Sequence, residues 1–151
     1  MVLLSNDANL LINANLPIAN TMKQDLIYKD LSYEITGVLF ETHNELGRFC
    51  NEKQCGDLIE KKLIDRKIKY EREKFLPTSF DGEKDNRNRI DFIIEDKIVL
   101  ELKCKRFIER SDFYQVKRYL TAIDFKLGLI VNFRDKYLKP KRILNSQVNI
   151  N

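Results

Sequence analysis

The sequence predicts a mixed α/β domain in which two helices precede three strands, a third helix and a further strand. Two observations predict this class. Apolar residues recur at steps of three and four between residues 27 and 66, whereas the period changes to two from residue 68 onward. Residues 127–133 are nearly all apolar, which is typical of a strand that is buried on both faces of a sheet.

The length and composition fit one globular domain without a membrane anchor. The chain has 151 residues, of which 43% are hydrophobic and 33% charged, and this balance excludes a disordered or low-complexity chain. No window reaches the ~18 uninterrupted apolar residues that a membrane span needs. The formal net charge of +4 permits an anionic partner but does not require one.

The cysteine pattern favours a reducing compartment. The three cysteines, Cys50, Cys55 and Cys104, cannot all pair with one another, and they lack a C-x-x-C spacing. The single histidine is His43. We therefore expect no structural zinc site, and we expect a cytoplasmic protein.

The first 21 residues differ from the rest of the chain. They contain no Lys or Arg and no sustained apolar period, and they lack the charged start and cleavage site of a secretory signal. We expect residues 1–21 to form a poorly ordered extension and residues 22–151 to form a single domain.

Two helices are expected at the start of this domain. The first carries an apolar stripe from Ile27 and ends before Gly47, which suits the left-handed position after a helix. Asn51 and Gln54 have the spacing of a capping box, so a second helix should follow and run to about residue 66.

The strands are bounded by turn signals. Residues 68–75 alternate loosely and carry many charges, which favours an edge strand. Residues 89–94 and 98–103 form the strongest hairpin signal, and residues 127–133 and 141–144 supply the later strands. Between them, Ser111 is placed to cap a third helix with an inward stripe of Phe113, Val116, Leu120 and Ile123.

The chemistry concentrates in the central hairpin. A turn of three residues, 95–97, would put Asp91 directly opposite Glu101 on one face, with Cβ atoms ~4.5–5.5 Å apart. A turn of two residues would put the carboxylates on opposite faces. Two ionised carboxylates ~5 Å apart repel by about 3 kcal/mol at an effective dielectric constant of ~20, and a hard cation such as Mg²⁺ offsets this repulsion. Lys103 shares that face and could orient a water or hold a phosphate oxygen.

Further polar residues could join this site, although each also has an ordinary structural explanation. Glu52 begins the second helix on its inward edge, where a carboxylate also stabilises the helix dipole. Gln115 and Tyr119 share one face of the third helix and could hold a phosphate backbone. Arg89 and Lys105 could contact phosphates, although such charges also occur on ordinary solvated faces.

These residues resemble the GxxExxY protein family, which belongs to the PD-(D/E)xK nuclease-like superfamily. The resemblance covers about residues 26–144 and includes the Glu101-Leu102-Lys103 triplet and the segment from Gln115 to Tyr119. Residues 45–47 followed by Glu52 match the family's E-L-G-x4-E stretch, whereas Phe49 and Cys55 stand where the family has Gly and Tyr.

The resemblance implies a restriction-endonuclease-like αβββαβ core of the PD-(D/E)xK type with an extra N-terminal helix. It also implies metal ligands at Asp91 and Glu101, with Glu52 as a further candidate, and a catalytic lysine at Lys103. We expect the Leu102 carbonyl oxygen to complete the metal coordination.

The resulting hypothesis is a metal-dependent nuclease with a D-x9-E-x-K site that uses Mg²⁺, for which Mn²⁺ can substitute. DNA is expected as the substrate ahead of RNA, and the sequence does not indicate an oligomeric state. The alternative is a catalytically silent nuclease fold that binds nucleic acid or a protein partner. A third possibility, a non-enzymatic RNA-binding domain, is disfavoured because no exposed aromatic platform is expected.

Overall fold

The computed structural model describes residues 27–148, so the predicted extension at residues 1–21 lies outside the described residues. The chain divides into two compact units, residues 1–34 and residues 35–151. The described part of the first unit contains the start of helix α2 (Lys29–Leu46), where the Ser32 hydroxyl donates a hydrogen bond to the Tyr28 carbonyl oxygen at 2.7 Å. Among the residues described, no helix has the length and apolar character to cross a membrane.

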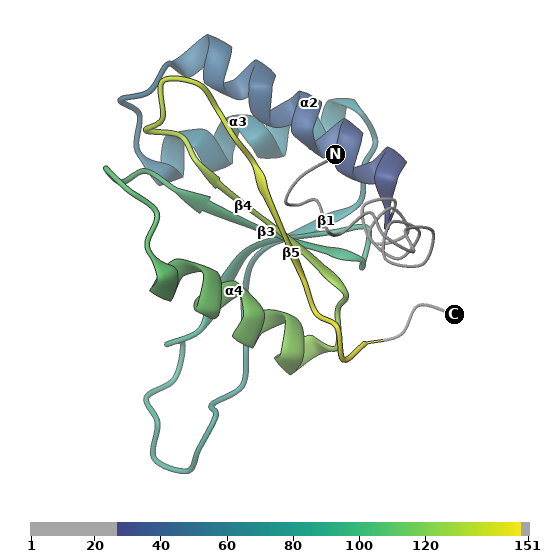
Figure 1. Ribbon diagram of the computed structural model, residues 1–151, viewed down its shortest axis with the longest axis vertical. Coiled ribbons are helices and arrows are strands. Elements are labelled where there is room, and N and C mark those ends of the chain that lie inside the picture. The colour runs from purple at the N-terminus through teal and green to yellow at the C-terminus, as the bar shows by residue number, and fades with distance from the viewer. Residues whose placement is uncertain (1–26, 149–151) are drawn as a thin grey trace, which may run out of the picture. The chain divides into compact units, whose positions relative to one another are not determined.

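The second unit is built around a five-stranded sheet with the strand order β1-β2-β3-β4-β5 (Figure 1). Strands β3 and β4 run parallel, and the other neighbouring pairs are antiparallel. The mixed α/β class is therefore confirmed, and β1 lies at an edge of the sheet as predicted. The elements after α2 are α3 (Glu52–Asp65), β1 (Tyr70–Phe75), β2 (Arg89–Ile94), β3 (Ile98–Lys103), α4 (Arg110–Ile123), β4 (Leu127–Asn132) and β5 (Lys141–Leu144).

Local sequence signals explain where α2 ends and α3 begins. Gly47 follows α2 with a φ of 75°, a left-handed conformation that costs little without a Cβ atom. The Asn51 side chain accepts a hydrogen bond from the Gln54 N–H at 2.8 Å, and the Gln54 side chain accepts one from the Asn51 N–H at 3.0 Å. The predicted capping box is confirmed.

The start of α4 differs from the prediction. The N-cap residue is Glu109, not Ser111, and the helix begins at Arg110. The reason is the Asp112 carboxylate, which reaches back and accepts a hydrogen bond from the Glu109 N–H at 2.7 Å. The helix therefore starts earlier than a Ser111 cap would have allowed.

The hairpin has the three-residue turn that the site requires. Phe92 pairs with Leu100 and Ile94 pairs with Ile98, so residues 95–97 form the connection. Glu95 and Asp96 have φ values of 54° and 53°, which matches the left-handed backbone of tight hairpin turns. Because this connection has an odd length, Asp91 and Glu101 fall on the same face of the sheet.

Helices cover both faces of the sheet. Figure 1 shows α4 on the side opposite α3. Val116 and Leu120 of α4 are fully buried against Val99, Ile130 and other residues of one sheet face, and Phe113 and Ile123 are partly buried beside them. All six residues of β4 are buried, as its apolar sequence predicted. The site residues therefore project from a sheet whose apolar side chains are packed against helices and shielded from solvent.

Gly128 tests the close approach of α4 to β4. A Cβ atom at this position would lie 2.6 Å from Val116 Cγ1, so Gly128→Ala should destabilise the protein by about 1–3 kcal/mol. Gly37 is a matched control in the interior of α2, where a Cβ atom would meet only the Arg66 guanidinium at 3.4 Å. Gly37→Ala should stabilise by ~0.5–1 kcal/mol through helix propensity. Urea denaturation of both variants measures this, and a Gly128→Ala variant as stable as the parent would contradict the packing described.

Candidate active site

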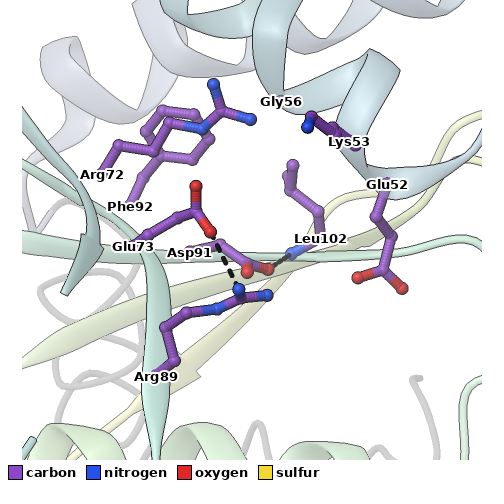
Figure 2. A pocket seen from close by; sticks show the side chains of 9 residues that line it. All are labelled: Glu52, Lys53, Gly56, Arg72, Glu73, Arg89, Asp91, Phe92 and Leu102. Carbon is purple, nitrogen blue, oxygen red and sulfur yellow. Dashed lines mark hydrogen bonds and ion pairs between the residues drawn. The ribbon is translucent and has the colours of Figure 1, made fainter. Parts of the chain in front are cut away.

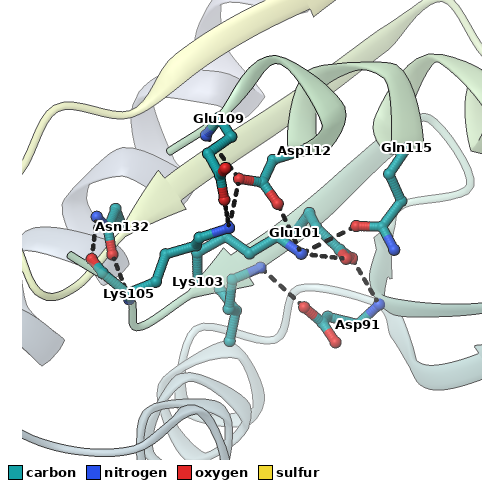
Figure 3. Close-up of polar contacts among 9 residues, drawn as sticks. Asp91, Glu101, Lys103, Lys105, Glu109, Asp112, Gln115 and Asn132 are labelled. Atoms are coloured by element: carbon teal, nitrogen blue, oxygen red, sulfur yellow. Dashed lines mark hydrogen bonds and ion pairs between the residues drawn. The ribbon is translucent and has the colours of Figure 1, made fainter. Parts of the chain in front are cut away.

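Asp91 and Glu101 face each other where β2 and β3 stop pairing through their backbones (Figure 3). Beyond the Phe92–Leu100 pair, side chains take over the hydrogen bonds of the ladder. The Asp91 N–H donates to Glu101 Oε1 at 3.3 Å, and the Leu102 N–H donates to Asp91 Oδ2 at 2.8 Å. The two carboxylates are thus fixed to the strands by main-chain groups.

The environment of this pair disfavours two negative charges. Glu101 is only 4% exposed, and burial followed by the charge of Asp91 raises the pKa of its carboxyl from 4.5 to about 9. Burial also raises the pKa of Asp91. A hydrogen bond between the two side chains further raises the pKa of Glu101 and partly offsets the rise in the pKa of Asp91, so the pair favours a state with a proton on Glu101. Hard oxygen donors in this state fit a divalent cation, which can replace the proton.

Lys103 is held beside the acidic pair by groups from two elements. Its Nζ donates a hydrogen bond to Gln115 Oε1 of α4 at 2.9 Å and lies 3.8 Å from Glu101 Oε2. Asp112 Oδ1 of α4 is 3.7 Å from the same nitrogen. The lysine side chain is only 15% exposed, so its ammonium group occupies a defined position next to the carboxylates.

Asp112 is a site residue that sequence reasoning missed. Burial opposes its ionisation, but the Glu109 N–H and the Lys105 ammonium hold the pKa of Asp112 below its ordinary value. It therefore presents a negative charge to both Lys103 and Lys105, whose Nζ lies 2.9 Å from Asp112 Oδ2. The available signal was an acidic residue in the first turn of the helix, a position that usually indicates only favourable helix-dipole electrostatics.

The loop after β3 is tied to β4 by Asn132, which sequence reasoning also missed. The Lys105 N–H donates to Asn132 Oδ1 at 3.1 Å, and Asn132 Nδ2 donates to the Lys105 carbonyl oxygen at 2.7 Å. The Lys105 ammonium is meanwhile engaged by Glu109 and Asp112, each at 2.9 Å. The structure therefore places Lys105 in an ion-pair cluster beside the site (Figure 3).

A cleft of about 300 Å³ opens on the Asp91 side of the pair (Figure 2). Glu52 at the start of α3 lines it together with Asp91, and Figure 2 shows the Glu52 carboxylate beside Leu102. Arg89 and Glu73 line the same cleft and form an ion pair at 2.8 Å. The remaining lining residues are Lys53, Gly56, Arg72 and Phe92.

The pKa of Glu52 indicates that its carboxyl group lies close enough to Asp91 and Lys103 to be affected by their charges. Burial raises the pKa of Glu52, and the negative charge of Asp91 raises it further. The Lys103 charge and a hydrogen bond from the Cys104 backbone lower it in part. Glu52 of α3 and Asp91 of β2 therefore line one cleft, and Glu101 of β3 accepts a hydrogen bond from the Asp91 N–H. The role of Glu52 as a metal ligand stays a prediction.

Glu73 marks an irregularity in β1 that the sequence did not predict. The pairs Arg72–Phe92 and Lys74–Ile90 flank a gap in the β1–β2 ladder, and Glu73 and Asp91 lie in that gap. Glu73 has a φ of 56°, which is a strained conformation for a residue other than glycine. The distortion lies beside Asp91 and gives the cleft its wall on the β1 side.

Tyr119 lies deeper than a direct substrate contact requires. It is 2% exposed, and burial followed by the charges of Glu101 and Asp91 raises its pKa to about 12. The phenol is therefore a neutral group beneath the acidic pair, in the core cluster of α4. This burial disfavours the predicted contact of Tyr119 with a phosphate backbone.

The structure brings most of the predicted site residues together. Asp91, Glu101, Lys103 and Gln115 form one connected group, and Glu52 and Arg89 line the adjoining cleft. Leu102 contributes its N–H to Asp91, whereas the role of its carbonyl oxygen as a metal ligand stays a prediction.

Several exposed aromatic side chains, each with a cation over its ring, contradict one expectation from the sequence. Phe49 is 75% exposed, and the guanidinium groups of Arg48 and Arg134 lie 5.2 and 5.1 Å from its ring centroid. Phe107 and Tyr137, 67% and 70% exposed, also carry cations over their rings. The expectation that no exposed aromatic platform exists was wrong, because burial of an aromatic residue in a loop cannot be judged from periodicity.

The fold is a mixed α/β domain. Its candidate site consists of two carboxyl groups and a lysine ammonium, next to a cleft that is lined by both basic and acidic side chains. The chain belongs to the PD-(D/E)XK nuclease superfamily, whose family model matches residues 29–143. Members of that superfamily are typically nucleases and generally use divalent metal ions. No curated protein and no solved structure matches the chain.

The raised pKa of Glu101 predicts an unusual pH dependence of stability. Folded Glu101 keeps its proton up to about pH 9, whereas the unfolded chain loses it near pH 4.5. The folded state therefore binds more protons between these values, and the free energy of unfolding of the metal-free protein should fall as the pH rises through this window. Glu101→Gln mimics the protonated side chain and should remove this component.

Urea denaturation in EDTA at several pH values between 5 and 9 measures the effect. The informative quantity is the difference in slope between the parent and Glu101→Gln, because other titrating groups are common to both. Identical slopes would show that Glu101 ionises normally in the folded protein.

Proposed function

We propose that this protein is a metal-dependent nuclease that hydrolyses phosphodiester bonds in nucleic acid at Asp91, Glu101 and Lys103. The observation that carries the proposal is the pair of carboxyl groups, with Glu101 buried and Asp91 partly exposed, which main-chain hydrogen bonds fix and which has one lysine ammonium held beside it. Membership of a nuclease superfamily supports the same conclusion.

The residues present fit a hard divalent cation. Asp91 and Glu101 would hold Mg²⁺ or Mn²⁺, with Glu52 and the Leu102 carbonyl oxygen as additional oxygen ligands. When bound, the cation would polarise the scissile phosphate and lower the pKa of a water molecule. Burial raises the pKa of both carboxyl groups, which favours a cation that would neutralise their charge.

Lys103 supplies a positive charge at a defined point. Gln115 and Asp112 of α4 hold its ammonium group near Glu101, so little rearrangement is needed when a substrate arrives. From there the ammonium would orient the attacking water or hold a nonbridging phosphate oxygen. Gln115 and Asp112 act as positioning residues because they work through Lys103.

The surroundings of the site suit a polynucleotide. Loops that contain Phe107 and Tyr137 follow β3 and β4, and parallel strands bring these loops to the same edge of the sheet as Lys103. The Phe133 N–H bonds the Lys103 carbonyl oxygen at 2.8 Å, which ties the two loops together at this edge. Exposed rings with cations beside them can stack on bases while the cations meet phosphates, as in proteins that bind single strands.

Several finer assignments belong to this proposal. Membership of the GxxExxY family is supported by residues 45–47 followed by Glu52. We further propose DNA ahead of RNA as the substrate, and the cytoplasm as the location, which fits three free cysteines.

A binding module without turnover is the competing function, favoured by the exposed aromatic side chains. A nuclease would use Asp91 and Glu101 to hold the metal ion, whereas a binding module would have no use for them. A pure binding module gains nothing from an acidic pair beside the cleft, because negative charge there repels phosphate. Incubation with single- and double-stranded DNA and RNA, in Mg²⁺, Mn²⁺ or EDTA, separates the two functions: cleavage that EDTA abolishes identifies the nuclease, and retention without cleavage identifies the binding module.

Lys103→Ala should lower the cleavage rate on the order of 10²–10³-fold, because it removes a preorganised charge from the reacting phosphate. The matched control is Lys61→Ala, which removes an exposed lysine of α3 whose Nζ lies 3.8 Å from Asp65 Oδ2, one helical turn away. It should cleave at the parent rate. Single-turnover cleavage of a labelled oligonucleotide measures both variants, and a Lys103→Ala variant as fast as the control would refute the assigned role.

A further inference from the structure

Three thiols meet next to the proposed nuclease site. The Sγ atoms of Cys50, Cys55 and Cys104 all lie within 4.8 Å of one another, and all three cysteines are free. They come from three different parts of the chain: the loop before α3, the first half of α3, and the residue after β3. This cluster was not expected from the sequence, which predicted no structural zinc site because the cysteines lack a C-x-x-C spacing.

The cluster has the dimensions of a metal site. Three thiolates on a tetrahedral Zn²⁺ ion, each ~2.3 Å from the metal, lie about 3.8 Å from one another. The observed separations lie on both sides of this value, since the Cys50 and Cys55 Sγ atoms are 2.6 Å apart and no pair exceeds 4.8 Å. Side-chain rotations that move Cys50 and Cys55 apart by about 1 Å would bring the thiols to the spacing of a tetrahedral site. Cys55 is buried while Cys50 and Cys104 are partly exposed, so an ion could enter from solvent.

We propose that Cys50, Cys55 and Cys104 form a second metal site that binds a thiophilic cation of the Zn²⁺ class. Thiolates select such ions, whereas the carboxylates of the cleft select hard cations such as Mg²⁺, so the two sites take different metals. Binding releases the thiol protons to solvent as three sulfur–metal bonds form. The fourth position on the ion stays open to water.

Metal binding at this site would have a defined mechanical effect. It would cross-link the start of α3 to the end of β3, two elements that each carry part of the carboxylate cleft. Glu52 lies between Cys50 and Cys55 in the chain, and its carboxylate accepts a hydrogen bond from the Cys104 backbone. The ion would therefore fix the position of Glu52 relative to Asp91 and stabilise the folded state by mass action.

A disulfide is the main competing explanation for adjacent thiols. A disulfide joins only two sulfur atoms, and it gives no reason for a third to lie within the same distance of both. A Zn²⁺ ion is bound by three or four protein ligands, so it explains why three thiols lie together. The two explanations also differ experimentally, because a reductant abolishes the disulfide and leaves the metal site intact.

The test is titration of the reduced full-length protein with Zn²⁺ against a chromophoric chelator, in a phosphine reductant. We expect one Zn²⁺ per chain, and Co²⁺ in its place should give a thiolate-to-cobalt charge-transfer band. Loss of a partner outside the ligand set already costs 10–100-fold in affinity, so Cys50→Ser and Cys104→Ser should each weaken binding on the order of 100-fold or more. Both residues are partly exposed, so these variants should fold, as a thermal melt will verify.

Two control variants locate the ion. His43→Gln removes the one histidine, whose Nε2 is 2.9 Å from the Asp135 carbonyl oxygen, and it should bind Zn²⁺ as the parent does. Asp91→Asn removes a carboxylate of the cleft and should also leave Zn²⁺ affinity unchanged, which separates this proposal from the nuclease proposal. Equal Zn²⁺ affinity in the parent and in folded Cys50→Ser would overturn the site, as would an absent charge-transfer band with Co²⁺.

Discussion

The repulsion between two neighbouring carboxyl groups is the constraint on which the rest of this structure depends. Asp91 and Glu101 lie opposite each other, with Glu101 buried and Asp91 partly exposed to the cleft, and burial disfavours a full charge on both. Main-chain N–H groups, the raised pKa of Glu101 and one lysine compensate for this repulsion in the metal-free protein. A divalent cation would replace the proton on Glu101 and remove the repulsion between the two carboxylates. The acidic pair therefore lowers the stability of the metal-free fold, but it provides the ligands that hydrolysis needs.

Each surrounding element contributes to this balance. The three-residue turn sets the register that brings the carboxyl groups to one face, and α4 supplies Gln115 and Asp112 to hold Lys103. The close packing of α4 on β4 at Gly128 fixes the helix that carries those groups. The chain belongs to the PD-(D/E)XK nuclease superfamily. In this member the sheet carries Asp91, Glu101 and Lys103, and helix α4 holds the lysine in position.

The sequence predicted the mixed α/β class and the strands because periodicity, capping and turn chemistry are local signals. It left the register of the hairpin open, because a turn of two residues and a turn of three residues both fitted residues 95–97. It failed where the deciding contact joins distant segments. In the sequence, Asp112 looks like an acidic residue that interacts with the helix dipole, and only the structure shows its distance to Lys103. The proximity of Cys50, Cys55 and Cys104 likewise depends on how α3 packs on β3. The left-handed backbone at Glu73 and the exposure of Phe49 likewise follow from tertiary structure, which no window of the sequence contains.

The most direct test of the account is the effect of Mg²⁺ on the stability of the parent and of Asp91→Asn, each measured in EDTA and in excess Mg²⁺. The account predicts that Mg²⁺ stabilises the parent by about 2.7 kcal/mol at a hundredfold excess over its dissociation constant. Asp91→Asn keeps an oxygen for the Leu102 N–H but removes one charge, so it should be no less stable in EDTA and should gain nothing from Mg²⁺. A parent that shows no Mg²⁺-dependent gain, together with an Asp91→Asn variant that is clearly destabilised in EDTA, would contradict the account and make the carboxylate pair structural.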